Sequence, residues 1–273
     1  MDPKIAAAII AALVSIFTLL ITSLIKPFWE KHFHKFKLKS DHDFEQRKQI
    51  KEAISKNKTM LLNSAESLNH RLWNFTENSD KEWHNISEND NLGDKYYLVS
   101  FCYRFLAFFA WCRIIEKNMM FLDSTLCEKD DLDLIKYLKL FPKMFCEVSL
   151  FKGQGYNSEN DTDHFFNDEF HLLVDSVVEE NKVISFSKFK ETSDFKDKYH
   201  KMLSYISETS NDKTCLKWSL LHAFHYALMP FLTRYGYDFQ KTSEDKLINL
   251  SKKLPQNILL QNVSNLINDF QLN

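Results

Sequence analysis

The sequence predicts an all-α protein: a single N-terminal transmembrane helix followed by an antiparallel multi-helix bundle. Three observations predict this class: an uncharged apolar run near the start, a shortage of glycine, and apolar residues at helical spacing through the remainder. The chain has only 4 glycines in 273 residues. Tight hairpins and phosphate-binding loops usually depend on glycine, because it tolerates positive φ. Long helices joined by short polar connections are therefore expected.

The predicted anchor is the run IAAAIIAALVSIFTLLITSLI at residues 5–25, which contains no charged residue. At ~1.5 Å per residue, a helix of this length spans a hydrocarbon core of ~30 Å. A cleaved signal peptide is the main alternative, but its apolar region would be only about 7–15 residues long, behind a more positive start. We divide the chain into an anchor (1–26), a basic juxtamembrane segment (27–42) and a cytosolic helical domain (43–273).

The flanking charges predict the orientation. Lysines are concentrated after the apolar run, whereas Lys4 and Asp2 are the only charged residues before it. The positive-inside rule then places the N-terminus outside and the C-terminal domain in the cytoplasm. The same flank, WEKHFHKFKLK, mixes aromatic and basic residues and could lie on anionic lipid. Membrane lipid is thus an expected partner, through residues 5–25 and through the flank.

Two further features bear on the compartment. The five cysteines form no CxxC pair and are odd in number, which favours reduced thiols over disulfides. The domain also contains N-x-S/T sequons, which could be glycosylated only if the domain were luminal. They begin at Asn57, Asn74, Asn85, Asn160, Asn249 and Asn262.

In the first half of the domain, residues 43–75 are predicted to form a long helix. Its apolar stripe repeats at steps of four and three. Residues 78–94 are polar and predicted to form a loop. Residues 96–122 are the most apolar part of the domain, and we interpret them as a buried central helix. A second membrane span is disfavoured because Arg104 and Arg113 would be costly in a bilayer.

In the second half, a helix is expected over residues 130–151, kinked or ended at Pro142. A loop follows at 152–162, and Asp163 is predicted to cap the next helix. Residues 182–189 alternate like a strand, yet Ser185 or Ser187 could cap a helix that runs to about Glu208. The remaining helices are expected over 213–234 and 257–270.

The candidate binding residues are Arg104, Arg113 and Glu116, all in the apolar central helix. A buried arginine requires a partner. Glu116 is close enough along the helix to pair with Arg113 but not with Arg104. A structural ion pair is the favoured interpretation, and an anion or partner site is the alternative.

No catalytic motif stands out, and we predict no catalytic residues and no cofactor. His222 and His225 have a spacing that can hold a metal, but no third ligand is evident, so they are weak candidates and packing is favoured. His42-Asp43 lacks the other histidines of metal phosphohydrolases. No arginine is followed at four to six residues by the histidine of helical toxin ribonucleases, and GxSxG, P-loop, GxGxxG and HExxH motifs do not occur.

The predicted function is a membrane-tethered interaction or sensing module, with a protein partner or self-association. The net charge of −2 gives no reason to expect nucleic-acid binding. Two alternatives stay open: a membrane effector in stress or phage defence that oligomerises through its anchor, and an unrecognised helical enzyme. The overall pattern resembles single-pass bacterial membrane proteins with a helical cytosolic domain, a resemblance that implies no activity.

Overall fold

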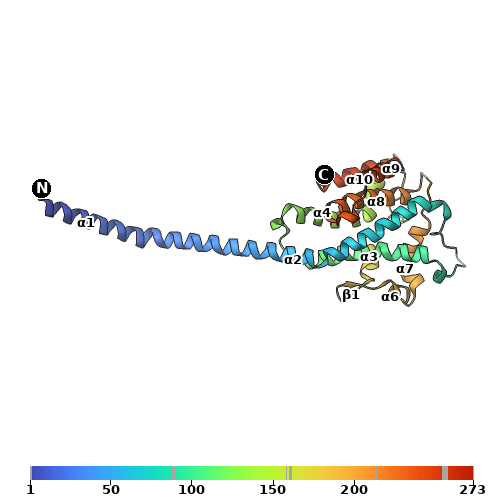
Figure 1. Ribbon diagram of the computed structural model, residues 1–273, viewed down its shortest axis with the longest axis horizontal. Coiled ribbons are helices and arrows are strands. Elements are labelled where there is room, and N and C mark those ends of the chain that lie inside the picture. Colours follow the sequence, from blue (N-terminus) through green and yellow to red (C-terminus); the bar gives the residue numbers. More distant parts are fainter. Residues whose placement is uncertain are drawn as a thin grey trace. The chain divides into compact units, whose positions relative to one another are not determined.

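The computed structural model describes residues 2–87, 90–157, 159, 162–212, 214–253 and 258–272. The described chain is mostly helical, as predicted (Figure 1). It divides into two compact units, Met1–Ile50 and Lys51–Asn273. Asn160, Lys213 and Asn257, which belonged to a predicted sequon and two predicted helices, lie outside the described residues.

The first unit is a continuous helical rod. It contains α1 (Pro3–Leu20), a π-helical turn (Ile21–Ile25) and the beginning of α2 (Lys26–Asn78). The basic segment 27–42 is therefore helical. The Asp2 side chain caps α1 by accepting a hydrogen bond from the Lys4 backbone N–H at 3.0 Å. No residue of α1 is buried against the described parts of the chain.

Hydroxyl side chains in the apolar run bond back to the helix backbone. Ser15 donates to the carbonyl of Ala11 at 2.9 Å, and Thr18 donates to that of Val14 at 2.8 Å. Thr22 makes the same type of bond. These bonds satisfy the polar groups of the run internally, which is what a lipid environment requires.

The second unit is a helical bundle built from the remainder of α2 and eight further helices among the described residues. The bounds are α3 (Tyr96–Met119), α4 (Lys129–Cys146), α5 (Asn167–Asp175), α6 (Phe186–Lys190), α7 (Phe195–Ser207), α8 (Leu216–Tyr235), α9 (Glu244–Lys253) and α10 (Ile258–Asp269). A short antiparallel pair, β1 (Val178–Glu179) and β2 (Lys182–Val183), precedes α6. Short 3₁₀ turns connect several of these elements.

Helix α3 is the centre of this bundle, and it contacts α4, α5, α6, α7 and β2. In the most apolar stretch of α3, 78% of the residues are buried inside the protein. This burial supports the interpretation of residues 96–122 as a core helix. Aromatic rings fill the interior: the ring centroid of Phe109 lies 5.0 Å from that of Phe170 and 5.7 Å from that of Phe224.

The predicted stripe on α2 is also confirmed. Its members are all at most 2% exposed: Leu61, Ala65, Leu68, Leu72 and Phe75. Because they recur at helical spacing, one face of α2 enters the core and the opposite face carries polar residues. All five cysteines are free thiols, and Cys102 and Cys112 are buried within α3.

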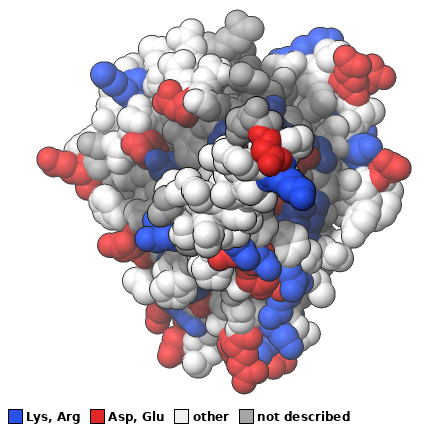
Figure 2. All heavy atoms as spheres, turned by 90° about the vertical axis from the view of Figure 1, so that its left-hand side faces the viewer, with Lys and Arg blue, Asp and Glu red and all other residues white. Residues whose placement is uncertain are grey.

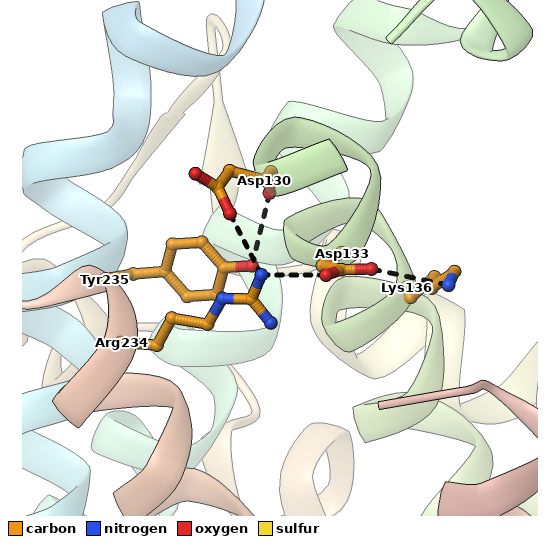
Figure 3. Close-up of polar contacts among 5 residues, drawn as sticks. All are labelled: Asp130, Asp133, Lys136, Arg234 and Tyr235. Carbon is orange, nitrogen blue, oxygen red and sulfur yellow. Dashed lines mark hydrogen bonds and ion pairs between the residues drawn. The ribbon is translucent and has the colours of Figure 1, made fainter. Parts of the chain in front are cut away.

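A charged cluster links α8 to α4 (Figure 3). Arg234 donates to Asp130 at 2.9 Å and to Asp133 at 2.7 Å, and Lys136 lies 3.3 Å from Asp133. Burial alone would raise the pKa of Asp133, but hydrogen bonds from Arg234 and Lys136 outweigh it and hold that pKa below its ordinary value. The Tyr235 hydroxyl adds a bond to the Asp130 carbonyl at 3.2 Å.

Two local predictions need correction. Helix α4 continues through Pro142 and ends at Cys146, so Pro142 does not end the helix predicted over residues 130–151. Buried Phe141, Met144 and Phe145 hold this part of α4 in the core despite the lost backbone donor. Asp163 does not cap α5, which begins at Asn167 after a Phe166 N-cap without a side-chain hydrogen bond. Phe165 instead donates its N–H to the Phe145 carbonyl at 2.9 Å, and this bond holds the chain against α4.

At residues 182–189 both alternatives are partly right. The first two residues form β2, and Ser185 then caps α6 by accepting from the Lys188 N–H at 3.2 Å. The helix expected to run to Glu208 is divided into α6 and α7, because Asp194 between them has a φ of 52°. Such a left-handed residue interrupts a helix.

Candidate functional site

Arg104 lies half-buried on α3 and lines a cavity of about 310 Å³. Its Nη1 donates to the Ser67 backbone carbonyl on α2 at 3.0 Å. The predicted ion pair for Arg104 is absent from the described part of the chain: its partners there are the Ser67 carbonyl and the Tyr96 hydroxyl, both neutral. Burial lowers the pKa of Arg104, and the nearby charge of Arg71 lowers it further.

Arg71 is the second cation of this cavity, and it comes from the facing helix α2. Its side chain is only 8% exposed. One Nη donates to the Ser100 hydroxyl at 2.7 Å, and the guanidinium lies over the Tyr97 ring, 4.2 Å from its centroid. Its buried Nε has no hydrogen-bond partner in the described chain. Arg71 thus also has only neutral partners there.

The remaining walls of the cavity are polar and aromatic. They comprise His70, Asn74, Trp83 and Tyr97. The Trp83 ring is 45% exposed, and its centroid is 5.7 Å from that of Tyr97. The Oδ1 of Asn74 is buried and accepts no hydrogen bond from the described residues. The pocket therefore combines two cations, an aromatic wall and unused hydrogen-bonding capacity.

The other two predicted binding residues line a different cavity, of about 680 Å³, between α3 and α4. The Nε of Arg113 lies 3.9 Å from a carboxylate oxygen of Asp175, which also accepts from Lys117 at 2.9 Å. Arg113 therefore lies near a carboxylate of α5, and no Arg113–Glu116 ion pair is found among the described residues. Glu116 has a raised pKa, because burial outweighs the nearby charges of Arg113 and Lys139.

The two histidines of α8 are separately engaged in the core. His222 donates from Nδ1 to the Trp218 carbonyl at 2.9 Å, and its Nε2 lies 3.0 Å from the Thr76 hydroxyl. His225 donates from Nε2 to the Asn69 side-chain oxygen at 2.8 Å. Burial, together with the neighbouring His222, lowers the pKa of His225 to about 3.

No group of three or more histidine, cysteine or acidic side chains that could hold a metal is found among the described residues. The buried Nδ1 of His225 has no hydrogen-bond partner among the described residues. On the face drawn in Figure 2, basic and acidic side chains are interspersed over the described surface.

The chain matches no protein-family model, no curated protein and no solved structure.

Arg71 is the residue that sequence reasoning missed. It lies on a helix whose stripe gives a clear core face, and it immediately precedes the stripe residue Leu72. That position is a boundary of the buried face, where an arginine ordinarily extends its head into solvent. Its burial follows from Tyr97 and Ser100 on α3, and local spacing does not reveal such a non-local contact.

Proposed function

We propose that this protein is a membrane-tethered helical module, held by one transmembrane helix at residues 5–25 with its folded unit in the cytoplasm. The observation that carries the proposal is an uncharged apolar helix whose large side chains are exposed, such as Ile10 at 62%, Leu13 at 61% and Phe17 at 66%. By length and composition the N-terminal helix could cross a membrane, and none of its apolar window is buried. Exposing that much apolar surface to water would be unfavourable.

The tether is tested by adding charge to the apolar run. Arginine at a span centre costs about 2.5–3.5 kcal/mol on the insertion scale. The variant Leu13→Arg/Ile16→Arg is therefore expected to move the protein from the membrane pellet to the supernatant after alkaline carbonate extraction. The matched control, Phe33→Arg/Phe36→Arg, adds the same charge outside the run and is expected to stay in the pellet. Equal retention of both variants would contradict the proposal.

The role of the folded unit is proposed to be the recognition of a protein partner. Large apolar side chains on its surface support this role: Phe121 is 87% exposed, Phe239 75% and Leu172 71%. Exposed apolar side chains mark an interaction surface where they form a contiguous patch, so each of the three positions is tested separately. Photo-crosslinking residues at these three positions should each give a discrete adduct, and one at exposed Lys252 should not. Absence of adducts at all three would count against a partner there.

A second candidate function is an effector that oligomerises through its anchor. Ala7, Ala11 and Ser15 recur at steps of four on α1. Small residues at this spacing let two membrane helices approach closely. Toxicity on overexpression that disappears when residues 1–26 are removed would support this function, and toxicity unchanged by the removal would exclude it.

A further inference from the structure

The Arg71–Arg104 cavity is unusual because it is lined by two guanidiniums, one of them buried, and no carboxylate of the described residues pairs with either. Each arginine has only neutral partners within the described chain. By comparison, Arg234 bonds two aspartates and Arg113 lies near Asp175. Two guanidiniums brought from facing helices into one pocket repel each other, and this arrangement is costly unless an anion is present.

We propose that this cavity binds a phosphate monoester. At neutral pH such a group carries a charge of about −1.5 to −2, which matches the two guanidiniums. A single carboxylate would balance only one of them. Arginine is also suited to phosphate by the planar fork of its donors, which bonds two oxygens at once.

The other groups of the cavity fit the organic part of such a ligand. Asn74 Oδ1 lacks a donor among the described residues, so it can accept from a hydroxyl or amino group. The half-exposed Trp83 ring offers an apolar face at the same pocket.

The size of the cavity limits the ligand. A volume of about 310 Å³ is at the lower end of the range for small-molecule sites, which is roughly 300–1,000 Å³. That space suits a mononucleotide or sugar phosphate. Phosphatidic acid presents the same phosphate monoester from a bilayer, so the experiment must distinguish a free source from a lipid source.

The test is calorimetric titration of the full chain in nanodiscs of phosphatidylcholine. The probes are inorganic phosphate, adenosine monophosphate and, as an uncharged control, adenosine. Saturable binding of the phosphorylated probes and none of adenosine is expected. The variants Arg104→Gln and Arg71→Gln should each weaken binding by about tenfold or more, because each removes a charge-assisted hydrogen-bond donor.

Arg234→Gln is the matched control: it removes the same charge from an arginine outside the cavity, and binding should not change. The titration with adenosine monophosphate is repeated in nanodiscs that contain phosphatidic acid. If the lipid competes with adenosine monophosphate, and if this competition is lost in Arg104→Gln, the lipid is the source of the phosphate. The proposal is overturned if no phosphorylated probe or lipid binds, or if Arg104→Gln binds as tightly as the wild type. Since Arg104 is only half-buried, its variant keeps the test valid even if Arg71→Gln fails to fold. The titration measures ligand binding at the Arg71–Arg104 cavity and not membrane insertion, so a lack of binding would leave the membrane proposal standing.

Discussion

Replacing Arg234 by glutamine should destabilise the helical unit by removing the link between α8 and α4 (Figure 3). The guanidinium bonds Asp130 and Asp133, but these two carboxylates differ in burial. The Asp133 side chain is 7% exposed, whereas that of Asp130 is 84% exposed. The loss of stability should therefore come almost entirely from Asp133, since an exposed ion pair contributes little.

The magnitude follows from what remains around Asp133. Removing one partner of a fully buried ion pair costs about 3–5 kcal/mol. Arg234 itself is 32% exposed, and Lys136 stays 3.3 Å from Asp133 after the substitution. Both facts reduce the cost, to about 1–2 kcal/mol. For a unit of this size each kcal/mol lowers Tm by roughly 2–4 °C, so the expected decrease in Tm is about 2–8 °C.

The assay is thermal unfolding of the full chain, followed by circular dichroism at pH 7. The control is Lys241→Gln, which removes an exposed ion pair with Asp238 and should not measurably change Tm. In an Asp133→Asn background, the effect of Arg234→Gln should shrink. An unchanged Tm for Arg234→Gln, or an equal decrease in that background, would refute the assigned role of the Arg234–Asp133 pair.

The pH dependence gives a second check on the same pair. Because the pKa of Asp133 lies below its ordinary value of 3.8, the unfolded chain binds this proton more readily than the folded chain. The resulting stability is present above pH 3.8 and is lost as the pH falls through the folded-state pKa. The difference in Tm between wild type and Arg234→Gln should thus be largest near neutral pH and smallest in strong acid.

Three other predictions concern the core and the charged cavity. Arg104→Gln should leave Tm unchanged or raise it at low salt, because it removes repulsion with Arg71 and breaks no ion pair; a decrease as large as that of Arg234→Gln would contradict this. Phe224→Ala should cost about 3–5 kcal/mol in chemical denaturation, since its ring is fully buried among other aromatic rings, while Phe121→Ala at 87% exposure should cost almost nothing. Because the pKa of His225 is lowered to about 3 from 6.5, the unfolded chain takes up a proton first and stability should fall as the pH drops from about 6.5. His225→Gln should flatten that part of the Tm profile, and an unaltered profile would show that another group is responsible.

The elements that sequence predicted well are those with strong apolar periodicity. The stripe from Leu61 to Phe75 and the core helix α3 are both found where the pattern placed them. The helical state of residues 27–42 was not predicted, although Trp29, Phe33 and Phe36 recur there at helical spacing, because the segment was interpreted only as a basic flank of the membrane anchor. The cap predicted at Asp163 is absent, because α5 begins only at Asn167 and the chain just before it bonds α4 through the Phe165 N–H, a non-local contact that spacing does not reveal.

The candidate site was only half predictable for the same reason. Arg104 stands out as a charge within an apolar helix, and that signal is local. Its neighbour Arg71 looks like an ordinary surface arginine until α3 is packed against α2. The partner of Arg113 was likewise beyond local reasoning, since Asp175 belongs to a helix on the far side of a polar loop. Residue spacing identifies faces of helices, and only packing determines which faces meet.

The central claim is the membrane tether with its folded unit in the cytoplasm, and protease protection tests it most directly. Bacterial cells expressing the full chain with a C-terminal tag are converted to intact spheroplasts and treated with protease. The account predicts that the tag survives in the membrane fraction and is digested only after detergent is added. Digestion of the tag in intact spheroplasts, or recovery of the full chain in the soluble fraction, would contradict it.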